Sequence, residues 1–161
     1  MYVYLKEDDD LMDVKSSINP RTIIVNSSSK SKDEVLKEII HSMHNAGNVS
    51  SEEGFLKSVY QRESQGVTGI GNGVAIPHGQ SESVVEPGVA IATLKDPIPW
   101  ESLDDQKTKI VVLFAVPDNS EGAKLHLQLL AQFARKLGDD DVLASLKSAK
   151  NVQEITAAFE N

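Results

Sequence analysis

The chain has 161 residues, which corresponds to one domain at roughly 100 to 200 residues per domain. It contains no cysteine, so disulfides, thiolate catalysis and cysteine-based zinc sites are excluded. With 16 basic and 24 acidic side chains the net charge is −8, which argues against nucleic acid and anionic membranes as partners, because such binding relies on lysine and arginine. Four histidines are left as the side chains best suited to chemistry near pH 7.

The N-terminal residues show no basic segment followed by an apolar one, and no apolar run approaches the roughly 18 residues of a membrane helix. These features predict a cytoplasmic protein without membrane insertion. Residues 1–17 are interpreted as an N-terminal extension with an acidic run at Glu7–Asp10, although Tyr2–Leu5 is compatible with an edge strand. Residues 18–161 are expected to form the domain.

The first elements of this domain are predicted to be one strand and two helices. A short β-branched segment, Thr22–Val25, is followed by two helical patterns, each opened by a serine with a glutamate three residues later. The first pattern starts at Ser31 and stops near Gly47, and the second extends from Ser50 to Gly66.

Two later segments, Val89–Leu94 and Ile110–Val116, are near-continuous apolar runs, which is typical of strands covered on both faces. A helix is predicted over Ala123–Leu137, and shorter helices near Asp141–Lys147 and Val152–Phe159. This order predicts a single α/β domain with a mixed, mainly parallel sheet flanked by helices on both faces. The runs of two or three helices between strands argue against a regular doubly wound repeat.

The segment Gly66–Gly79 is unusual because its first eight residues include four glycines. Such a density indicates backbone in conformations that other residues avoid, or backbone that approaches another group closely. A P-loop is excluded because no Gly-Lys-Ser/Thr follows, and a dinucleotide fingerprint because the glycines precede the strand Val74–Ile76. A glycine-rich turn that joins a helix to a strand is the structural alternative.

The tripeptide Pro77-His78-Gly79 places a histidine at the end of this short strand, with a restricted backbone before it and a free one after it. A neutral imidazole is a nucleophile near pH 7 without a separate base. Taken alone, however, such a histidine is more often a packed or merely exposed residue than a nucleophile.

Several residues around His78 resemble the signature of fructose/mannitol-type enzyme IIA domains, the EIIA type-2 family of the bacterial phosphoenolpyruvate-dependent sugar phosphotransferase system. They are Arg62, Glu63, Gly66 and the run Thr68–Gly79. The resemblance continues with Trp100 and with His126-Leu127, and it covers roughly residues 18–159. Two departures, Ser64 and Val67, involve neither the histidines nor Arg62.

This resemblance implies a phosphoryl relay. His78 would accept a phosphoryl group from the phosphohistidine of the carrier protein HPr and pass it to an enzyme IIB partner, commonly to a cysteine. Arg62 would supply a fork of fixed charge to the phosphoryl oxygens, and His126, placed at the start of a helix, a second hydrogen bond. Backbone N–H groups of the glycine-rich segment could also reach the phosphate, and the side chains of Thr68 and Asn72 are weaker candidates. The further candidates for phosphate binding are thus Thr68, Gly69, Gly71, Asn72 and Gly73. No cofactor and no metal are implied.

Other functions remain open at this point. In a regulatory, nitrogen-type IIA protein, phosphorylation of His78 would switch binding to a target protein. A binding module with an inert histidine is a third class. His41 and His44 lack a nearby carboxylate or cysteine in sequence to complete a metal site and are interpreted as helix-surface residues, and Trp100 as a packing anchor. The sugar is expected to be selected by the IIB and membrane components, through which the protein would associate indirectly with the membrane.

Overall fold

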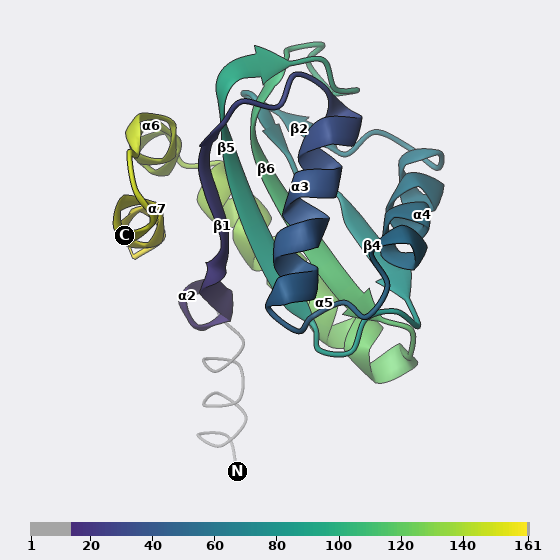
Figure 1. Ribbon diagram of the computed structural model, residues 1–161. Helices are drawn as coiled ribbons and strands as arrows, with labels where there is room; N and C mark the ends of the chain where they lie inside the picture. The colour runs from purple at the N-terminus through teal and green to yellow at the C-terminus, as the bar shows by residue number, and fades with distance from the viewer. Residues whose placement is uncertain (1–13, 161) are drawn as a thin grey trace.

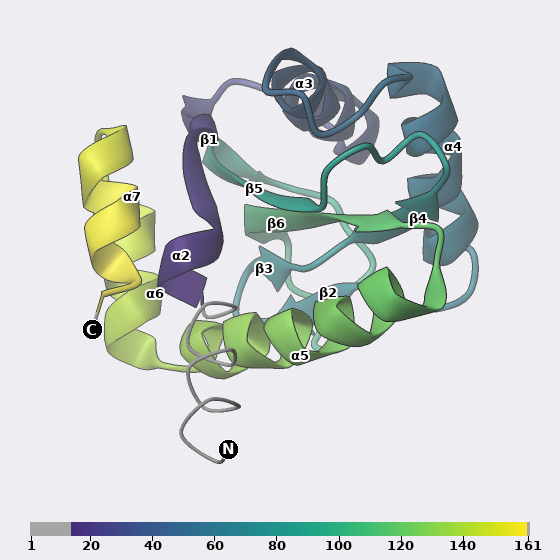
Figure 2. The ribbon, with the colours of Figure 1, turned by 90° about the horizontal axis from the view of Figure 1, so that it is seen from below.

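The computed structural model describes residues 14–160, so the possible edge strand at Tyr2–Leu5 lies outside the described residues. Figures 1 and 2 show one sheet between layers of helices. None of the helices among residues 14–160 has the length and apolar character needed to cross a membrane. In chain order the elements are α2 (Val14–Ser17), β1 (Ile18–Ser27), α3 (Lys32–Asn45), α4 (Glu52–Glu63), β2 (Gly69–Gly71), β3 (Val74–Ala75), β4 (His78–Ser81), β5 (Gly88–Ile98), β6 (Thr108–Pro117), α5 (Ser120–Leu137), α6 (Asp140–Ser148) and α7 (Val152–Ala158).

The sheet has six strands in the order β1-β5-β6-β3-β2, and β4 pairs with β6 further along the same edge as β3. The pairs β1–β5, β3–β6 and β4–β6 are parallel, whereas β5–β6 and β2–β3 are antiparallel. The predicted mixed, mainly parallel sheet is therefore confirmed.

The strands β5 and β6 are covered on both faces, as their apolar runs predict. Val112 and Phe114 of β6 belong to the core shared with α5, α6 and α7, whereas Val111 and Leu113 belong to the core shared with α3 and α4. Successive side chains of a strand point to opposite faces, so each layer of helices has its own core. Figure 2 shows α3 and α4 on one side of the sheet and α5 on the other.

The helices α3 and α4 start directly after a serine that caps the first turn. The Ser31 hydroxyl accepts a hydrogen bond from the Glu34 N–H, so α3 begins where the sequence predicts. Helix α4 begins one residue later than predicted, because Ser51 is the cap and accepts from the Gly54 N–H. The hydroxyl of Ser50 instead donates to a loop carbonyl at Ser83.

The region before the first strand is described only from Val14. Residues 14–17 of the expected extension form the short helix α2, and Val14 is 4 % exposed and packs in the core beside α5, α6 and α7. The first strand extends over Ile18–Ser27, well beyond the predicted Thr22–Val25, because its ends pair with β5. Strand pairing thus lengthens an element whose apolar pattern is short.

Candidate functional site

His78 is the first residue of β4 and lies opposite Phe114 of β6 in the parallel register. The sequence predicts it at the end of a strand, but β3 ends at Ala75 and a separate strand starts at the histidine. The side chain is half-buried, and its Nδ1 atom is buried without a hydrogen-bond partner among residues 14–160. The Nε2 atom is therefore the nitrogen open to a reacting group.

Gly79 explains how α4 reaches this strand. A Cβ atom built on Gly79 would lie 2.5 Å from Ser58 Oγ and 2.9 Å from atoms of Phe55 and Val59, all on α4. Only glycine permits such a close approach of helix and strand. Because neighbouring strand residues face opposite sides, His78 points away from this contact and towards α5.

His126 of α5 meets His78 on that side. The centroids of the two imidazole rings are 5.4 Å apart with an interplanar angle of 45°. The His126 ring also packs edge-on against Phe114 at 5.1 Å, and its Nε2 atom is buried without a hydrogen-bond partner in the described part of the chain. The structure therefore brings together the two histidines predicted for the site, with one unpaired nitrogen on each ring.

The position of His126 within α5 differs from the prediction. The helix begins at Ser120, capped by Asn119, rather than at Ala123. His126 is thus the seventh residue of α5, about 9 Å along the axis from its start at 1.5 Å per residue. The expectation that the helix N-terminus would add positive potential for a phosphoryl group beside His126 is therefore wrong, because that effect fades within the first turn.

Arg62 lies in the last turn of α4. Its Nη1 atom donates a hydrogen bond of 3.1 Å to the Gly66 carbonyl, which holds the chain that leaves the helix. The guanidinium is close enough to His78 for its positive charge to help lower the pKa of that histidine. Arg62, through its charge, and His126, through its ring contact, therefore each act on His78.

Both imidazoles favour the neutral form. Burial is the main cause that lowers the pKa of His78, followed by the charge of Arg62, while the Ile76 backbone and the Glu63 carboxylate act in the opposite direction. Burial, followed by repulsion from His78, lowers the pKa of His126 to about 4. At pH 7 each ring therefore has one N–H and one lone pair.

A buried network beside Arg62 was not predicted from the sequence. The Glu63 carboxylate, whose side chain is 6 % exposed, accepts a hydrogen bond of 2.6 Å from Thr68 and forms an ion pair of 2.6 Å with Lys32. Lys32 also pairs with Glu101 at 2.7 Å and lies 4.9 Å from the centroid of the Trp100 ring. The adjacency of Glu63 to Arg62 was the only local signal, because Lys32 is 31 residues away in sequence.

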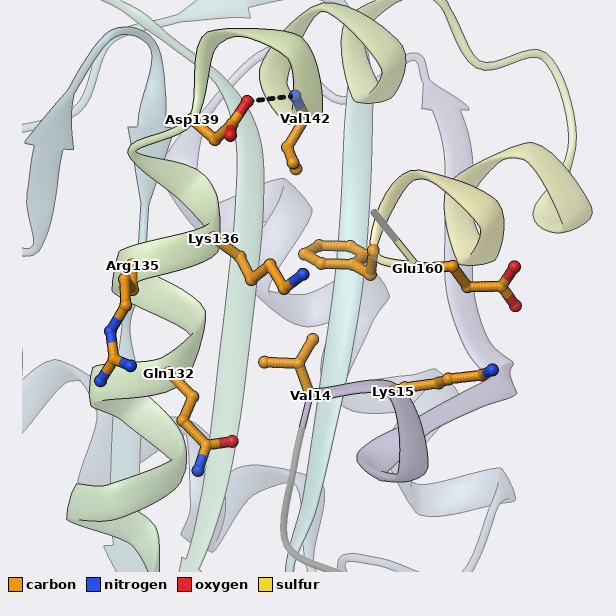
Figure 3. A pocket seen from close by; sticks show the side chains of 9 residues that line it. Val14, Lys15, Gln132, Arg135, Lys136, Asp139, Val142 and Glu160 are labelled. Atoms are coloured by element: carbon orange, nitrogen blue, oxygen red, sulfur yellow. Dashed lines mark hydrogen bonds between the residues drawn. The ribbon is translucent and has the colours of Figure 1, made fainter. Parts of the chain in front are cut away.

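The pocket of Figure 3 is separate from these residues. It has a volume of about 480 Å³ and is formed where α2 meets α5 and the segments after it. Gln132 on its wall is six residues, about 9 Å along the α5 axis, beyond His126. The lining residues are Val14, Lys15, Gln132, Arg135, Lys136, Asp139, Val142, Phe159 and Glu160, none of which is predicted for the site.

The structure thus brings His126 into contact with His78 and places the charge of Arg62 near enough to act on His78. A family model described as "Phosphoenolpyruvate-dependent sugar phosphotransferase system, EIIA 2" matches residues 16–161. The chain belongs to this EIIA type-2 family. Members of this family are phosphotransferase components of a sugar-transport system. The family is thus one of phosphoryl-relay proteins, and the chain is assigned to it on that basis.

One curated relative is a much longer protein than this chain. The chain is 34% identical over 152 residues to the 2-O-alpha-mannosyl-D-glycerate-specific EIIABC component of Escherichia coli K12, covering 94% of this chain and 23% of that protein. It spans about a quarter of the length of the first curated relatives it matches.

Two solved structures show the same fold. The nitrogen regulatory protein IIA-Ntr from Neisseria meningitidis superposes with a TM-score of 0.81 at 24% identity, covering 91% of this chain and 98% of that one. The mannitol enzyme IIA of Escherichia coli, in complex with phosphorylated enzyme IIB, superposes with a TM-score of 0.75 at 19% identity, covering 89% and 96%.

The glycine turn of this EIIA domain does not lie at His78. Val74, which follows the turn, pairs with Ile110, whereas His78 pairs with Phe114, four residues further along β6. At about 3.3 Å per residue, the turn is roughly 13 Å away along the strand. The structure therefore does not bring Gly71, Asn72 and Gly73 together with the histidines, because the turn lies beside the start of β6 and His78 beside its middle.

Gly69 and Thr68 are structural neighbours of the site. Gly69 exchanges backbone hydrogen bonds with Glu101 and Leu103, and an added Cβ atom would lie 2.6 Å from Ser102 Cβ. The Thr68 hydroxyl donates to Glu63 and accepts from the Trp100 Nε1–H, so its single donor is occupied. Trp100 is 7 % exposed and is the packing residue that the sequence predicts.

The other two histidines of this EIIA domain lie on α3. Nδ1 of His41 is 3.2 Å from a Glu52 oxygen, and Nδ1 of His44 is 2.8 Å from the Val49 carbonyl. Within residues 14–160 no group of three or more histidine, cysteine, aspartate or glutamate side chains is arranged to hold a metal.

Proposed function

We propose that this protein carries a phosphoryl group on His78, taking it from the phosphohistidine of an HPr-type carrier and passing it to an enzyme IIB partner. The observation that carries the proposal is the contact between His78 and His126, with the charge of Arg62 near enough to act on His78. The motif around His78 and the membership in the EIIA family support it.

The transfer step needs only a neutral imidazole on the acceptor. We assign the proton of the neutral ring to Nδ1 of His78, the nitrogen that is buried, so that the lone pair of Nε2 attacks phosphorus. The new Nε2–P bond forms as the P–N bond of the donor breaks, and that electron pair returns to the donor imidazole. A lowered pKa keeps His78 in this reactive form at neutral pH.

Arg62 and His126 stabilise the charge that the phosphoryl oxygens carry. The guanidinium supplies a permanent charge and a fork of N–H donors that matches these oxygens. His126 is neutral at pH 7, so it donates one N–H without placing a positive charge beside the His78 ring. Preorganised donors of this kind account for much of the acceleration in phosphoryl transfer.

The test is phosphorylation of the purified protein with phosphoenolpyruvate, enzyme I and HPr, followed by intact mass spectrometry. We expect one acid-labile phosphoryl group, absent in His78→Ala. His126→Ala is expected to fold and to be phosphorylated more slowly. His41→Ala and His44→Ala are matched controls that keep the wild-type rate. Phosphorylation of His78→Ala to the wild-type level rejects the assignment, and a wild-type rate in His126→Ala removes that residue from the site.

A regulatory role is the second candidate, supported by the fold shared with the nitrogen regulatory protein IIA-Ntr. A dianionic group added at His78 changes the charge of the surface that a target protein would contact. Pull-down experiments with phosphorylated and unphosphorylated protein separate the two roles. A stable complex with a protein outside transport, formed in one state only, favours regulation, and an IIB partner that accepts the phosphoryl group favours transport.

A further inference from the structure

We propose that a second anion site, remote from His78, binds the phosphate group of a small phosphorylated metabolite. It is the pocket of about 410 Å³ beside the glycine turn, called here the lysine pocket. The residues that matter to the argument are Asn72, Gly73, Asp104, Lys107, Lys109 and Lys147.

The lysine pocket gathers positive charge in an acidic protein. Lys107 lies in the connection before β6, Lys109 in β6 itself and Lys147 near the end of α6. None of the three forms an ion pair with a carboxylate of residues 14–160, whereas Lys30 and Lys32 do. Three lysines and one aspartate on its wall give the pocket a net charge of +2, in a chain of net charge −8.

The single carboxylate of the lysine pocket is engaged with other donors. Asp104 Oδ2 accepts a hydrogen bond of 2.9 Å from the Asn72 N–H, and Oδ1 accepts from the Ser102 hydroxyl at 3.0 Å and the Gln106 N–H at 3.1 Å. Asp104 therefore fixes the shape of the two loops and makes no ion pair with the three lysines. The charge of Lys109 also acts on the exposed Asp96, which is already paired with Lys30, and the three ammonium groups form no ion pair within residues 14–160 that an external anion would have to break.

The ammonium group of Lys147 lies beside the glycine turn. Gly73 has φ +80°, a left-handed conformation, and an added Cβ atom would lie 3.9 Å from Lys147 Nζ. Asn72 is also left-handed, with φ +59°. The turn that the sequence singled out for phosphate thus borders a cationic pocket, four residues along β6 from His78.

The chemistry of the pocket selects the class of ligand. Ammonium groups bind a phosphate dianion through charge-assisted hydrogen bonds. A volume of about 410 Å³ lies in the range of small-molecule sites and has room for a sugar attached to the phosphate. Free inorganic phosphate shares the charge but fills little of this space.

The test is a ¹H–¹⁵N NMR titration of the His78→Ala protein with glucose 6-phosphate, glucose and inorganic phosphate. Using this variant separates the lysine pocket from the phosphorylation site, so failure of either proposal is seen independently. We expect saturable shifts of the Asn72 and Gly73 amides with the ester, none with glucose, and affinity that falls with added salt.

Variants locate the binding. Lys109→Gln combined with Lys147→Gln should weaken binding of the ester by about tenfold or more, the effect of losing charge-assisted hydrogen bonds. Lys57→Gln combined with Lys124→Gln removes the same charge from exposed positions elsewhere and should leave affinity unchanged. Absence of shifts, equal affinity in the pocket variant, or binding of inorganic phosphate without the ester would overturn the proposal.

Discussion

The Thr68 hydroxyl donates a hydrogen bond of 2.6 Å to the Glu63 carboxylate, the residue next to Arg62. The same oxygen accepts a hydrogen bond of 3.0 Å from Trp100 Nε1. Because Glu63 also pairs with Lys32, the end of α4 is tied to α3 and to the segment before β2. The position of Arg62 therefore depends on side chains that never reach the phosphoryl group.

Replacing Thr68 tests this linkage. Thr68→Val has the same shape but leaves the Trp100 N–H unpaired and takes one donor from Glu63, so we expect the free energy of unfolding to fall by about 2 kcal/mol. Thr68→Ser keeps the hydroxyl and should recover most of that loss in urea denaturation. If Thr68→Val is as stable as the wild type, the network contributes no net stability.

Glu63→Gln removes the partner of a largely buried ammonium group. We expect a loss of about 3 kcal/mol in the free energy of unfolding, because Lys32 would keep its charge with only the exposed Glu101 beside it. The variant should also lower the pKa of His78 further, since Glu63 favours the protonated ring.

The matched control is Asp96→Asn, which breaks the pair between Lys30 and Asp96, both 67% exposed. Exposed pairs contribute little, so the loss there should be much smaller. Equal losses in the two variants would contradict the view that burial makes the Glu63 pair important.

Substitution of Arg62 separates its charge from its geometry. Arg62→Gln should slow phosphorylation of His78 by about 10²-fold, the effect of losing one preorganised donor group. It should also raise the pKa of His78, because the guanidinium charge disfavours the protonated ring. Arg62→Lys keeps the charge without the fork, so the pKa should stay low while the rate stays reduced. Both quantities are measured by NMR titration and rapid-quench kinetics; an unchanged pKa in Arg62→Gln would place Arg62 away from the ring.

Stability should depend on pH through His126. In the unfolded chain this histidine takes up a proton near pH 6.5, but in the folded protein only near pH 4. The unfolded state therefore binds more protons between these values, and the free energy of unfolding falls as the pH decreases. The wild type should lose about 2 kcal/mol more than His126→Gln between pH 7 and 4.5. Parallel pH profiles of the two proteins would show that His126 is not desolvated as described.

Gly69→Ala should destabilise the fold. The added Cβ atom would lie 2.6 to 2.8 Å from backbone and side-chain atoms of Glu101 and Ser102, so we expect a loss of about 3 kcal/mol. Gly66→Ala, in the same segment, meets only the end of the Arg62 side chain at 3.9 Å and should be nearly neutral. Thermal denaturation of both variants checks this; equal melting temperatures would mean that β2 moves to make room.

Local patterns in the sequence determined much of the fold. The apolar runs at Val89–Leu94 and Ile110–Val116 predicted strands buried on both faces, because alternate residues must each meet a helix layer. The cap at Ser31 predicted the start of α3, since a side-chain hydrogen bond to the first turn is a local interaction. The motif around His78 likewise singled out the histidine, Arg62 and His126 as candidates before any contact was known.

Only the tertiary structure decided which of these residues meet. Strand register sets His78 opposite Phe114 and keeps the glycine turn four residues away along β6, because the chain from Val74 to His78 runs in step with β6 instead of folding back. The contacts of Lys32 with Glu63 and Glu101 join residues 31 and 69 positions apart. Burial, which lowers the pKa of both imidazoles, arises from the packing of α4 and α5 around β4 and β6. The sequence alone thus determined the chemical groups, and packing decided their distances, their charge states and the separation of the histidine site from the lysine pocket.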